Sequence, residues 1–361
     1  MQRFDPSVYE QQRSPGGPPV IRLALGALLA GAVLVGVLFV LRADRVLLQL
    51  NTAEIKEAAV PAEGISQQVF PASLSLQISQ PADESWLLPV AALPADEAIF
   101  VLDAGNNRLL KLDQDGAILG IFDKSSDERL DLQQPMAMAT DGERLYIANS
   151  LAASIIVVNF SGQVEAVLPL QAALPGETTP RPIGIAVTPD GEIVVSDANN
   201  HRVLFLDAGG QLVRAAGTGT RSAGEQGFNV PGGLAVDSAS NVYVVDTLNG
   251  RVVELSPDGA FVRQFGELGS TAGTLSRPKG VAVDGAGRVF VSDGLLAAVQ
   301  VFGPDGAFLG IIGRRDPADA AAGSLFQAPA GLWLDGGTLY VTDRFAGVMA
   351  LRLSAAAGPG S

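Results

Sequence analysis

The sequence predicts an all-β fold, a six-bladed β-propeller at residues 73–353, preceded by one transmembrane α-helix at residues 23–41. Three observations support this prediction. The chain repeats one pattern six times at a spacing of about 48 residues, each copy consists of short apolar runs separated by turn residues, and the N-terminal region holds a long uncharged apolar run. Repeats of this length that contain only strands are typical of propeller blades.

Two markers keep the same register through all six copies of the repeat. A proline opens each copy, and an Asp or Asn ends its second apolar run. The prolines are Pro89, Pro135, Pro182, Pro231, Pro278 and Pro329. The residues that end the second run are Asp103, Asn149, Asp197, Asp246, Asp293 and Asp343. Two independent markers in one register are not expected by chance, so each copy is predicted to be one structural unit.

Each copy has the pattern of a small antiparallel sheet. Its apolar runs are rich in Val, Ile, Leu, Phe and Tyr, and Asp-Gly, Pro-Asp-Gly or Gly-Gly separates them, as in hairpin turns. One such sheet cannot cover both of its own faces, whereas six sheets arranged radially cover one another. The last copy ends after its third run, at residues 347–353, and we expect residues 73–79 to pair with that run and close the ring.

The clearest copies are the third, fourth and fifth, which begin RPIGIAVTPDG, VPGGLAVDSAS and RPKGVAVDGAG. The first two of these continue as EIVVSDANNHRV and NVYVVDTLNGRV. These residues resemble the NHL repeat, whose pattern is roughly P-x-G-[IV]-A-V-D followed by Y-V-x-D-x-x-N-x-R-[IV]. The resemblance covers about residues 86–353. It implies a six-bladed β-propeller that binds proteins, glycans or other ligands through a face formed by loops.

Residues 23–41 are uncharged and mainly apolar, and Arg22 and Arg42 bound them. As an α-helix they would extend about 28 Å, which is close to the thickness of the hydrocarbon core of a bilayer. The preceding tail is longer than that of a typical signal peptide, and the following sequence, FVLRADRV, offers no small-x-small cleavage site. We therefore expect an uncleaved signal anchor rather than a cleaved signal peptide.

This span separates a disordered cytoplasmic tail at residues 1–22 from a spacer at residues 42–72, the propeller, and a second disordered tail at residues 354–361. Lys and Arg are equally frequent on the two sides of the span, so the positive-inside rule does not decide the orientation. Short basic N-termini usually stay in the cytoplasm. We therefore expect a single-pass protein of the cytoplasmic (inner) membrane with an extracytoplasmic propeller.

The composition excludes several kinds of site. The chain has no cysteine, which rules out disulfides, thiolate metal sites, c-type haem attachment and cysteine nucleophiles. Its formal net charge is −14 at pH 7, whereas proteins that bind nucleic acid present a basic patch. We therefore expect no nucleic-acid partner.

The residue after each marker proline indicates the chemistry at the mouth of the central channel, because the first strand of each blade lines that channel. These residues are Val90, Met136, Ile183, Gly232, Lys279 and Ala330. They include none of the carboxylates or histidines that calcium and zinc sites use. The single histidine, His201, lies in a turn. We therefore expect no catalytic, metal-binding or cofactor-binding residue, no cofactor, and a chain that is not an enzyme.

Three of the blades carry a polar pattern that predicts a structural turn, which we call the turn clasp. The Asp that ends the second strand is followed by Asn at the third position and by Arg at the fifth. Asn tolerates the left-handed conformation of a turn, and the Arg guanidinium can fold back onto the Asp carboxylate. The clasps are Asp103, Asn106 and Arg108, then Asp197, Asn200 and Arg202, and finally Asp246, Asn249 and Arg251.

Blades two, five and six lack the Asn and Arg of the clasp, and their turns carry apolar residues instead. These residues are Leu151, Leu295, Leu296 and Phe345. The turns should project from one face together with the long inter-blade loops, and exposed apolar surface often marks a partner site. We expect this loop face to bind a protein or an envelope ligand. The alternative is that the inter-blade loops cover these side chains.

These features favour a membrane-tethered extracytoplasmic propeller that acts as a binding or scaffold module, or as a subunit of a membrane complex. Function nevertheless depends on sites rather than on the fold. A metal-dependent enzyme of the lactonase or lyase type is one alternative, because related propellers include such enzymes. The sensor part of a signalling system, whose short N-terminal tail contacts a separate cytoplasmic partner, is the other.

Overall fold

The computed structural model of the chain describes residues 69–79, 86–170, 178–313 and 324–354. These residues form strands β1–β24 and contain no α-helix. The all-β fold is therefore confirmed, whereas the predicted span at residues 23–41 and both predicted tails lie outside the described residues. No helix of the described part is long and apolar enough to cross a membrane.

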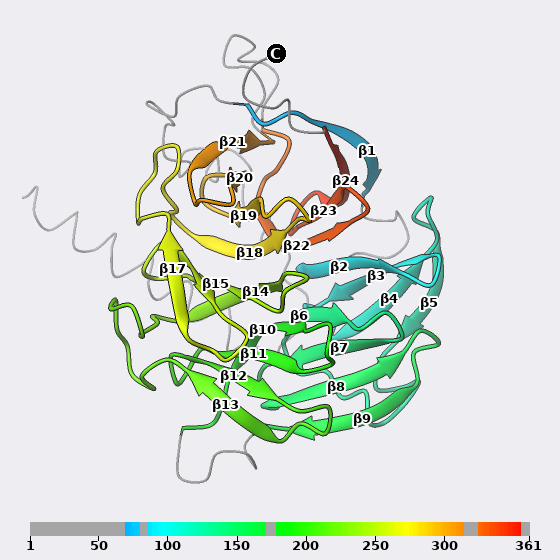
Figure 1. Ribbon diagram of the computed structural model, residues 1–361. Coiled ribbons are helices and arrows are strands. Elements are labelled where there is room, and N and C mark those ends of the chain that lie inside the picture. The colour runs from blue at the N-terminus through cyan, green and yellow to red at the C-terminus, as the bar shows by residue number, and fades with distance from the viewer. Residues whose placement is uncertain (1–68, 80–85, 171–177, 314–323, 355–361) are drawn as a thin grey trace, which may run out of the picture. The chain divides into compact units, whose positions relative to one another are not determined.

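The strands form six four-stranded antiparallel sheets, which are the blades of a β-propeller (Figure 1). Blade one contains β2 (Pro89–Ala95), β3 (Ala98–Asp103), β4 (Arg108–Leu112) and β5 (Ile118–Phe122). Blade two contains β6 (Pro135–Thr140), β7 (Arg144–Asn149), β8 (Ser154–Asn159) and β9 (Val164–Pro169). Blade three contains β10 (Pro182–Val187), β11 (Ile193–Asp197), β12 (Arg202–Leu206) and β13 (Leu212–Ala216).

The remaining blades keep the same order, and each again begins at its marker proline. Blade four contains β14 (Pro231–Val236), β15 (Val242–Asp246), β16 (Arg251–Leu255) and β17 (Phe261–Phe265). Blade five contains β18 (Pro278–Val283), β19 (Val289–Asp293), β20 (Ala298–Phe302) and β21 (Phe308–Ile312). Blade six contains β22 (Pro329–Asp335), β23 (Thr338–Asp343), β24 (Gly347–Leu353) and β1 (Ala72–Ile78).

The ring closes through strands from opposite ends of the propeller. Strand β1 is antiparallel to β24, with Ala72 opposite Leu353 and Ile78 opposite Val348. The expected pairing of the segment before blade one with the last repeat is therefore present. The first strands β2, β6, β10, β14, β18 and β22 contact one another in turn, and β22 contacts β2, so they enclose a central channel.

Burial differs systematically between the inner and outer strands of a blade. The second and third strands are mostly buried, and β11 and β12 are buried at every residue, because the neighbouring blades cover both of their faces. The outer strands β13 and β17 alternate between exposed and less exposed residues, because only one of their faces is covered. This difference explains why the second and third apolar runs of each copy are nearly continuous while the fourth alternates.

A glycine in the first strand lets neighbouring blades approach closely at the channel. A Cβ atom built on Gly280 would lie 2.4 Å from the carbonyl oxygen of Ala330 in the next blade. A Cβ atom built on Gly331 of blade six would likewise lie 2.3 Å from the carbonyl oxygen of Val90 in blade one, where the ring closes. The third position of the P-x-G pattern therefore sets how tightly the first strands pack.

Candidate functional site

The central channel opens into a cavity of about 280 Å³ at the end where the first strands begin. The residue after each marker proline lines it in all six blades, namely Val90, Met136, Ile183, Gly232, Lys279 and Ala330. Most of the wall is apolar, with Met138, Ile185 and Leu234 below this first ring of residues. We call this cavity the channel mouth.

Three basic side chains line the channel mouth, which is therefore not chemically bare. They are Arg181, Lys279 and Arg344. A fourth basic residue, Arg277, lies close enough to lower the pKa values of Lys279 and Arg344. Sequence reasoning identified Lys279 but missed Arg181 and Arg344, because it considered only the residue after each proline. Arg181 directly precedes Pro182, and Arg344 directly follows Asp343, so both flank the repeat's markers.

The channel mouth carries an excess of basic side chains. Burial, together with the positive charges of Arg344 and Arg277, lowers the pKa of Lys279 to about 8, although Asp293 acts in the opposite direction. Burial and Arg277 also lower the pKa of Arg344. Among the described residues, no acidic side chain forms a salt bridge with Arg181, Lys279 or Arg344. The Nε atom of Arg181 is buried without a hydrogen-bond partner. The carboxylates of Asp293 and Asp343 offset part of this charge, since each raises the pKa of its basic neighbour. Positive charge that is only partly compensated in a concave site still attracts an anion.

A second cavity of about 190 Å³ continues the channel towards its other end. It shares five wall residues with the mouth, which are Met138, Ile185, Leu234, Val281 and Leu332. The side chains beyond them include Val187, Val236 and Trp333. Because the three basic groups line the mouth and not this second cavity, the mouth is the candidate site.

The channel does not suit a divalent metal ion. Neither cavity is lined by a histidine or a carboxylate, and three basic groups would repel a cation at the mouth. Within the described ranges, no group of three His, Cys, Asp or Glu residues is placed to hold a metal. The metal-dependent version of the enzyme alternative therefore does not fit the residues of this channel.

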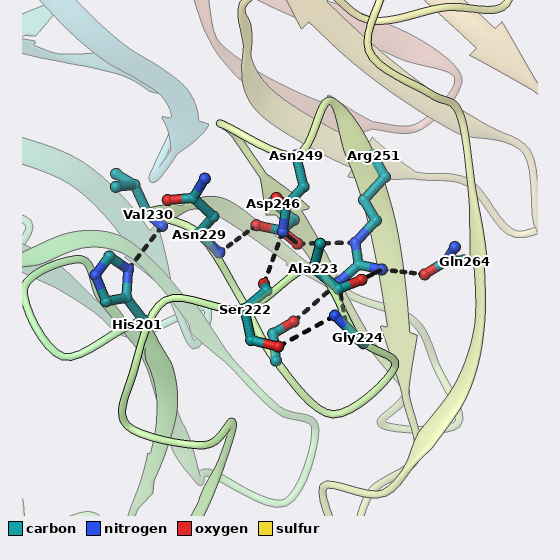
Figure 2. Close-up of polar contacts among 11 residues, drawn as sticks. His201, Ser222, Ala223, Gly224, Asn229, Val230, Asp246, Asn249, Arg251 and Gln264 are labelled. Atoms are coloured by element: carbon teal, nitrogen blue, oxygen red, sulfur yellow. Dashed lines mark hydrogen bonds and ion pairs between the residues drawn. The ribbon is translucent and has the colours of Figure 1, made fainter.

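The turn clasp residues lie around the carboxylates that end the second strands. In blade four, Asn249 Nδ2 and Arg251 Nε donate hydrogen bonds to Asp246 at 2.7 and 2.8 Å (Figure 2). The backbone N–H of Asn229, in the preceding inter-blade loop, donates to the same carboxylate at 2.7 Å. Asp246 therefore ties the turn to the incoming loop.

The other two clasps repeat this arrangement. Asp103 accepts from Asn106 at 2.7 Å and from Arg108 at 2.9 Å, and Asp197 accepts from Asn200 at 2.6 Å and from Arg202 at 3.2 Å. In each clasp the carboxylate is buried, and these contacts hold the turn rather than line the channel.

Blades five and six hold the same carboxylate with backbone groups instead of Asn and Arg. Asp293 accepts from the N–H groups of Leu295 and Leu296, each at 3.0 Å. Asp343 accepts from the N–H groups of Phe345 and Ala346 at 2.9 and 3.0 Å. The apolar turns therefore still donate hydrogen bonds to the carboxylate that ends the second strand, although they lack the Asn and Arg side chains of the turn clasp.

The side chains of these apolar turns differ in exposure. Leu151, Leu295 and Phe345 are 63%, 40% and 60% exposed, whereas Leu296 is only partly exposed. The inter-blade loops of the described part therefore leave three of the four uncovered.

His201 has a structural contact in its turn. Its Nδ1 atom accepts a hydrogen bond from the backbone N–H of Val230 at 3.1 Å, which links blade three to the loop that enters blade four (Figure 2). It does not line the channel mouth.

Comparisons with known proteins agree with this fold. The NHL repeat family matches residues 179–204 of the chain. No curated protein matches it. Among solved structures, virginiamycin B lyase from Staphylococcus aureus is 14% identical with a TM-score of 0.54, covering 79% of this chain and 100% of that one. A gluconolactonase from Xanthomonas campestris is 20% identical with a TM-score of 0.54, covering 80% of this chain and 99% of that one.

A putative gluconolactonase is also similar, at 18% identity and a TM-score of 0.58, with coverage of 81% of this chain and 97% of that one. These neighbours are named as a lyase and as gluconolactonases, which contradicts the expectation that the chain is not an enzyme. At 14–20% identity the likeness itself shows only the shared fold. The reaction therefore has to be argued from the residues of this chain.

Proposed function

The chain is a six-bladed β-propeller of the NHL-repeat type, and we propose that it is a lactonase-type enzyme that opens a small lactone or ester at the channel mouth. The observation that carries this proposal is the convergence of Arg181, Lys279 and Arg344, none of which forms a salt bridge among the described residues, on one concave and largely apolar cavity. The names of the similar propellers, a lyase and gluconolactonases, support it.

The charge at the mouth suits this reaction because a neutral lactone becomes an oxyanion in the transition state. Interactions that strengthen as charge develops accelerate the chemical step, and preorganised cations in a poorly hydrated site supply them. Arg181 and Arg344 would stabilise the oxyanion, and afterwards the product carboxylate. The apolar wall at Val90, Met136 and Ile183 would hold the hydrocarbon part of the substrate.

Lys279 is the candidate general base of this reaction. Its neutral amine would accept a proton from a water molecule whose oxygen attacks the carbonyl carbon. Collapse of the oxyanion then breaks the C–O ester bond, and the ammonium group returns the proton to the leaving alkoxide. A base works best when its pKa lies near the working pH, and burial brings the pKa of Lys279 into that range.

Hydrolysis of a panel of neutral lactones and 4-nitrophenyl esters by the full-length protein tests the proposal. Replacing a general base typically costs about 100-fold or more in rate, so Lys279→Met should lose at least that much. Lys111→Met is the matched control, because Lys111 pairs with Asp96 and does not line the channel mouth. Equal turnover by Lys279→Met and the unsubstituted protein would refute the role of Lys279, and no turnover of any substrate would refute the reaction.

We also propose that the propeller is held outside the cytoplasm by the predicted anchor at residues 23–41. The absence of cysteine allows a clean test, since a single Val262→Cys substitution places one thiol at an exposed position of β17. A membrane-impermeant maleimide should label this thiol in intact cells. Labelling only after the cells are lysed would instead place the propeller in the cytoplasm.

A further inference from the structure

Three levels of residues line the central channel, and their chemistry changes from one level to the next. The first level is the residue after each marker proline, and it includes Lys279. The second level lies three residues after the proline and lines both cavities, and the third lies five residues after it and lines only the second cavity. Two residues of a strand extend about 7 Å, which is the spacing of successive levels along the strand. The second level consists of Met138, Ile185, Leu234, Val281 and Leu332, and the third of Thr140, Val187, Val236, Val283 and Leu334.

The second level divides the channel, and we call it the waist. Each waist residue pairs with a β-branched residue in the second strand of its blade, as Met138 pairs with Ile147 and Val281 with Val291. Although they line two cavities, Met138, Ile185 and Val281 are only 6%, 4% and 3% exposed. Their side chains therefore fill most of the space between the cavities, and the channel mouth has an apolar floor.

The charged side chains of the channel lie above the waist. Arg181, Lys279 and Arg344 line the mouth, whereas no described residue that lines the second cavity is charged. A carboxylate would bind at the mouth, because a guanidinium group can hold both of its oxygens. The rest of such a ligand would then contact the apolar wall and the waist.

The wall of the mouth offers little hydrogen bonding to the rest of a ligand. Thr247 is the one neutral hydrogen-bonding side chain among the described residues that line it. A Cβ atom built on Gly232 would lie 2.7 Å from the Thr247 hydroxyl oxygen, so the glycine leaves this hydroxyl uncovered. A ligand hydroxyl that is buried without a partner weakens binding. Once the basic groups hold a carboxylate, a ligand with many hydroxyl groups therefore does not match this wall.

We propose that the channel mouth selects small carboxylates with a short apolar carbon chain, and the lactones that open to them, and that Met138 at the waist limits the length of that chain. The lactone part rests on the proposed function, whereas the binding of the carboxylate does not. A cavity of about 280 Å³ suits a small ligand, since ligand pockets typically measure about 300–1,000 Å³. Met138 has the longest side chain of the waist residues, so its removal would open the floor most.

Titration calorimetry of the full-length protein in lipid nanodiscs, with empty nanodiscs as the blank, tests the ligand class. Hexanoate and gluconate have the same charge and carbon chain but differ in hydroxyl groups, so hexanoate should bind at least about tenfold more tightly. From acetate to hexanoate, each added methylene group should strengthen binding about fourfold. Equal affinity for hexanoate and gluconate, or for hexanoate and acetate, would overturn the proposal.

Octanoate and decanoate test the waist. Affinity should not rise beyond hexanoate in the unsubstituted protein, because the chain has reached the floor, whereas Met138→Ala should extend the rise to longer chains. Met349→Ala is the matched control, since Met349 is also buried but lines neither cavity. Val281→Ala removes less volume from the waist and should give a smaller extension, so the test stands even where Met138→Ala does not fold. An affinity that rises equally through decanoate in all these proteins would overturn the role of Met138.

This proposal and the proposed reaction fail separately. Binding of hexanoate in the expected pattern without hydrolysis of any lactone would refute the reaction and support the ligand class. Faster hydrolysis of gluconolactone than of an alkyl-substituted lactone with the same ring size would support the reaction and refute the ligand class.

Discussion

Gly280 in the first strand of blade five lies directly against the carbonyl oxygen of Ala330 in blade six. The contact joins two neighbouring first strands at the channel mouth, one residue away from Lys279. Because Gly280 has no side chain, blades five and six can pack closely here, and this packing also positions the neighbouring Lys279, the candidate base.

Replacing Gly280 by Val should destabilise the propeller. A Cβ atom at this position would lie 2.4 Å from backbone oxygen, so the strands must move apart, and overpacking of this kind costs about 1–3 kcal/mol. Thermal unfolding should show a melting temperature lowered by about 2–4 °C for each kcal/mol. Gly285→Ala is the control, since a Cβ there meets nothing within 4 Å. A melting temperature that falls equally in both variants would contradict this explanation.

The sequence predicted the ring and its markers because each marker acts within its own repeat. Both markers are local features: a proline begins each first strand, and in three blades the carboxylate of the Asp that ends the second strand accepts hydrogen bonds from Asn three residues later and Arg five residues later. The basic mouth was harder to predict, since Arg181, Lys279 and Arg344 come from blades three, five and six and converge only when the ring closes. The sequence feature that could have indicated these two arginines is their position: Arg181 precedes a marker proline and Arg344 follows a marker Asp.

The anchoring bonds of blades five and six could not be predicted from residue types. Their carboxylates, Asp293 and Asp343, accept from backbone N–H groups of the turn, and every residue except proline has such a group. The absence of Asn and Arg from these blades therefore suggested that the carboxylate has no hydrogen-bond donors in the turn. In the structure, backbone N–H groups replace the side-chain donors.

Removing the carboxylate of a turn clasp should be among the most destabilising single changes. Asp246→Ala would leave the buried guanidinium of Arg251 without its anionic partner, and breaking a buried pair from one side costs about 3–5 kcal/mol. Urea unfolding of the variant measures this loss. Asp258→Ala, in an exposed turn, should leave the midpoint nearly unchanged.

A second variant separates the ion pair from the packing of this turn. If the cost comes from the unpaired charge, the double substitution Asp246→Leu and Arg251→Met should be less destabilising than Asp246→Ala alone. A double variant that is less stable than the single variant would show that shape and the loop contacts dominate.

Closure of the ring should depend on one apolar residue of β1. Ile78 is 4% exposed and packs beside Val348, whereas Leu74 on the same strand is 44% exposed. Ile78→Ala should lower the free energy of unfolding by about 2–5 kcal/mol, and Leu74→Ala should have little effect. Hydrogen exchange of β24 amides is the local readout, since they should exchange faster in Ile78→Ala. Unchanged exchange there would mean that β1 does not hold the ring closed.

The pH dependence of the protein should reveal the environment of Lys279. Burial and two positive neighbours hold its pKa at about 8 in the folded chain, against 10.5 for an ordinary lysine. The folded state therefore releases this proton at lower pH than the unfolded state, so stability rises with pH between about 8 and 10.5 relative to Lys279→Met. Hydrolysis by the neutral amine should rise through about pH 8, and inhibition by simple anions such as acetate should weaken over the same interval. A stability difference between the two proteins that is flat from pH 7 to pH 10 would show that Lys279 is freely solvated.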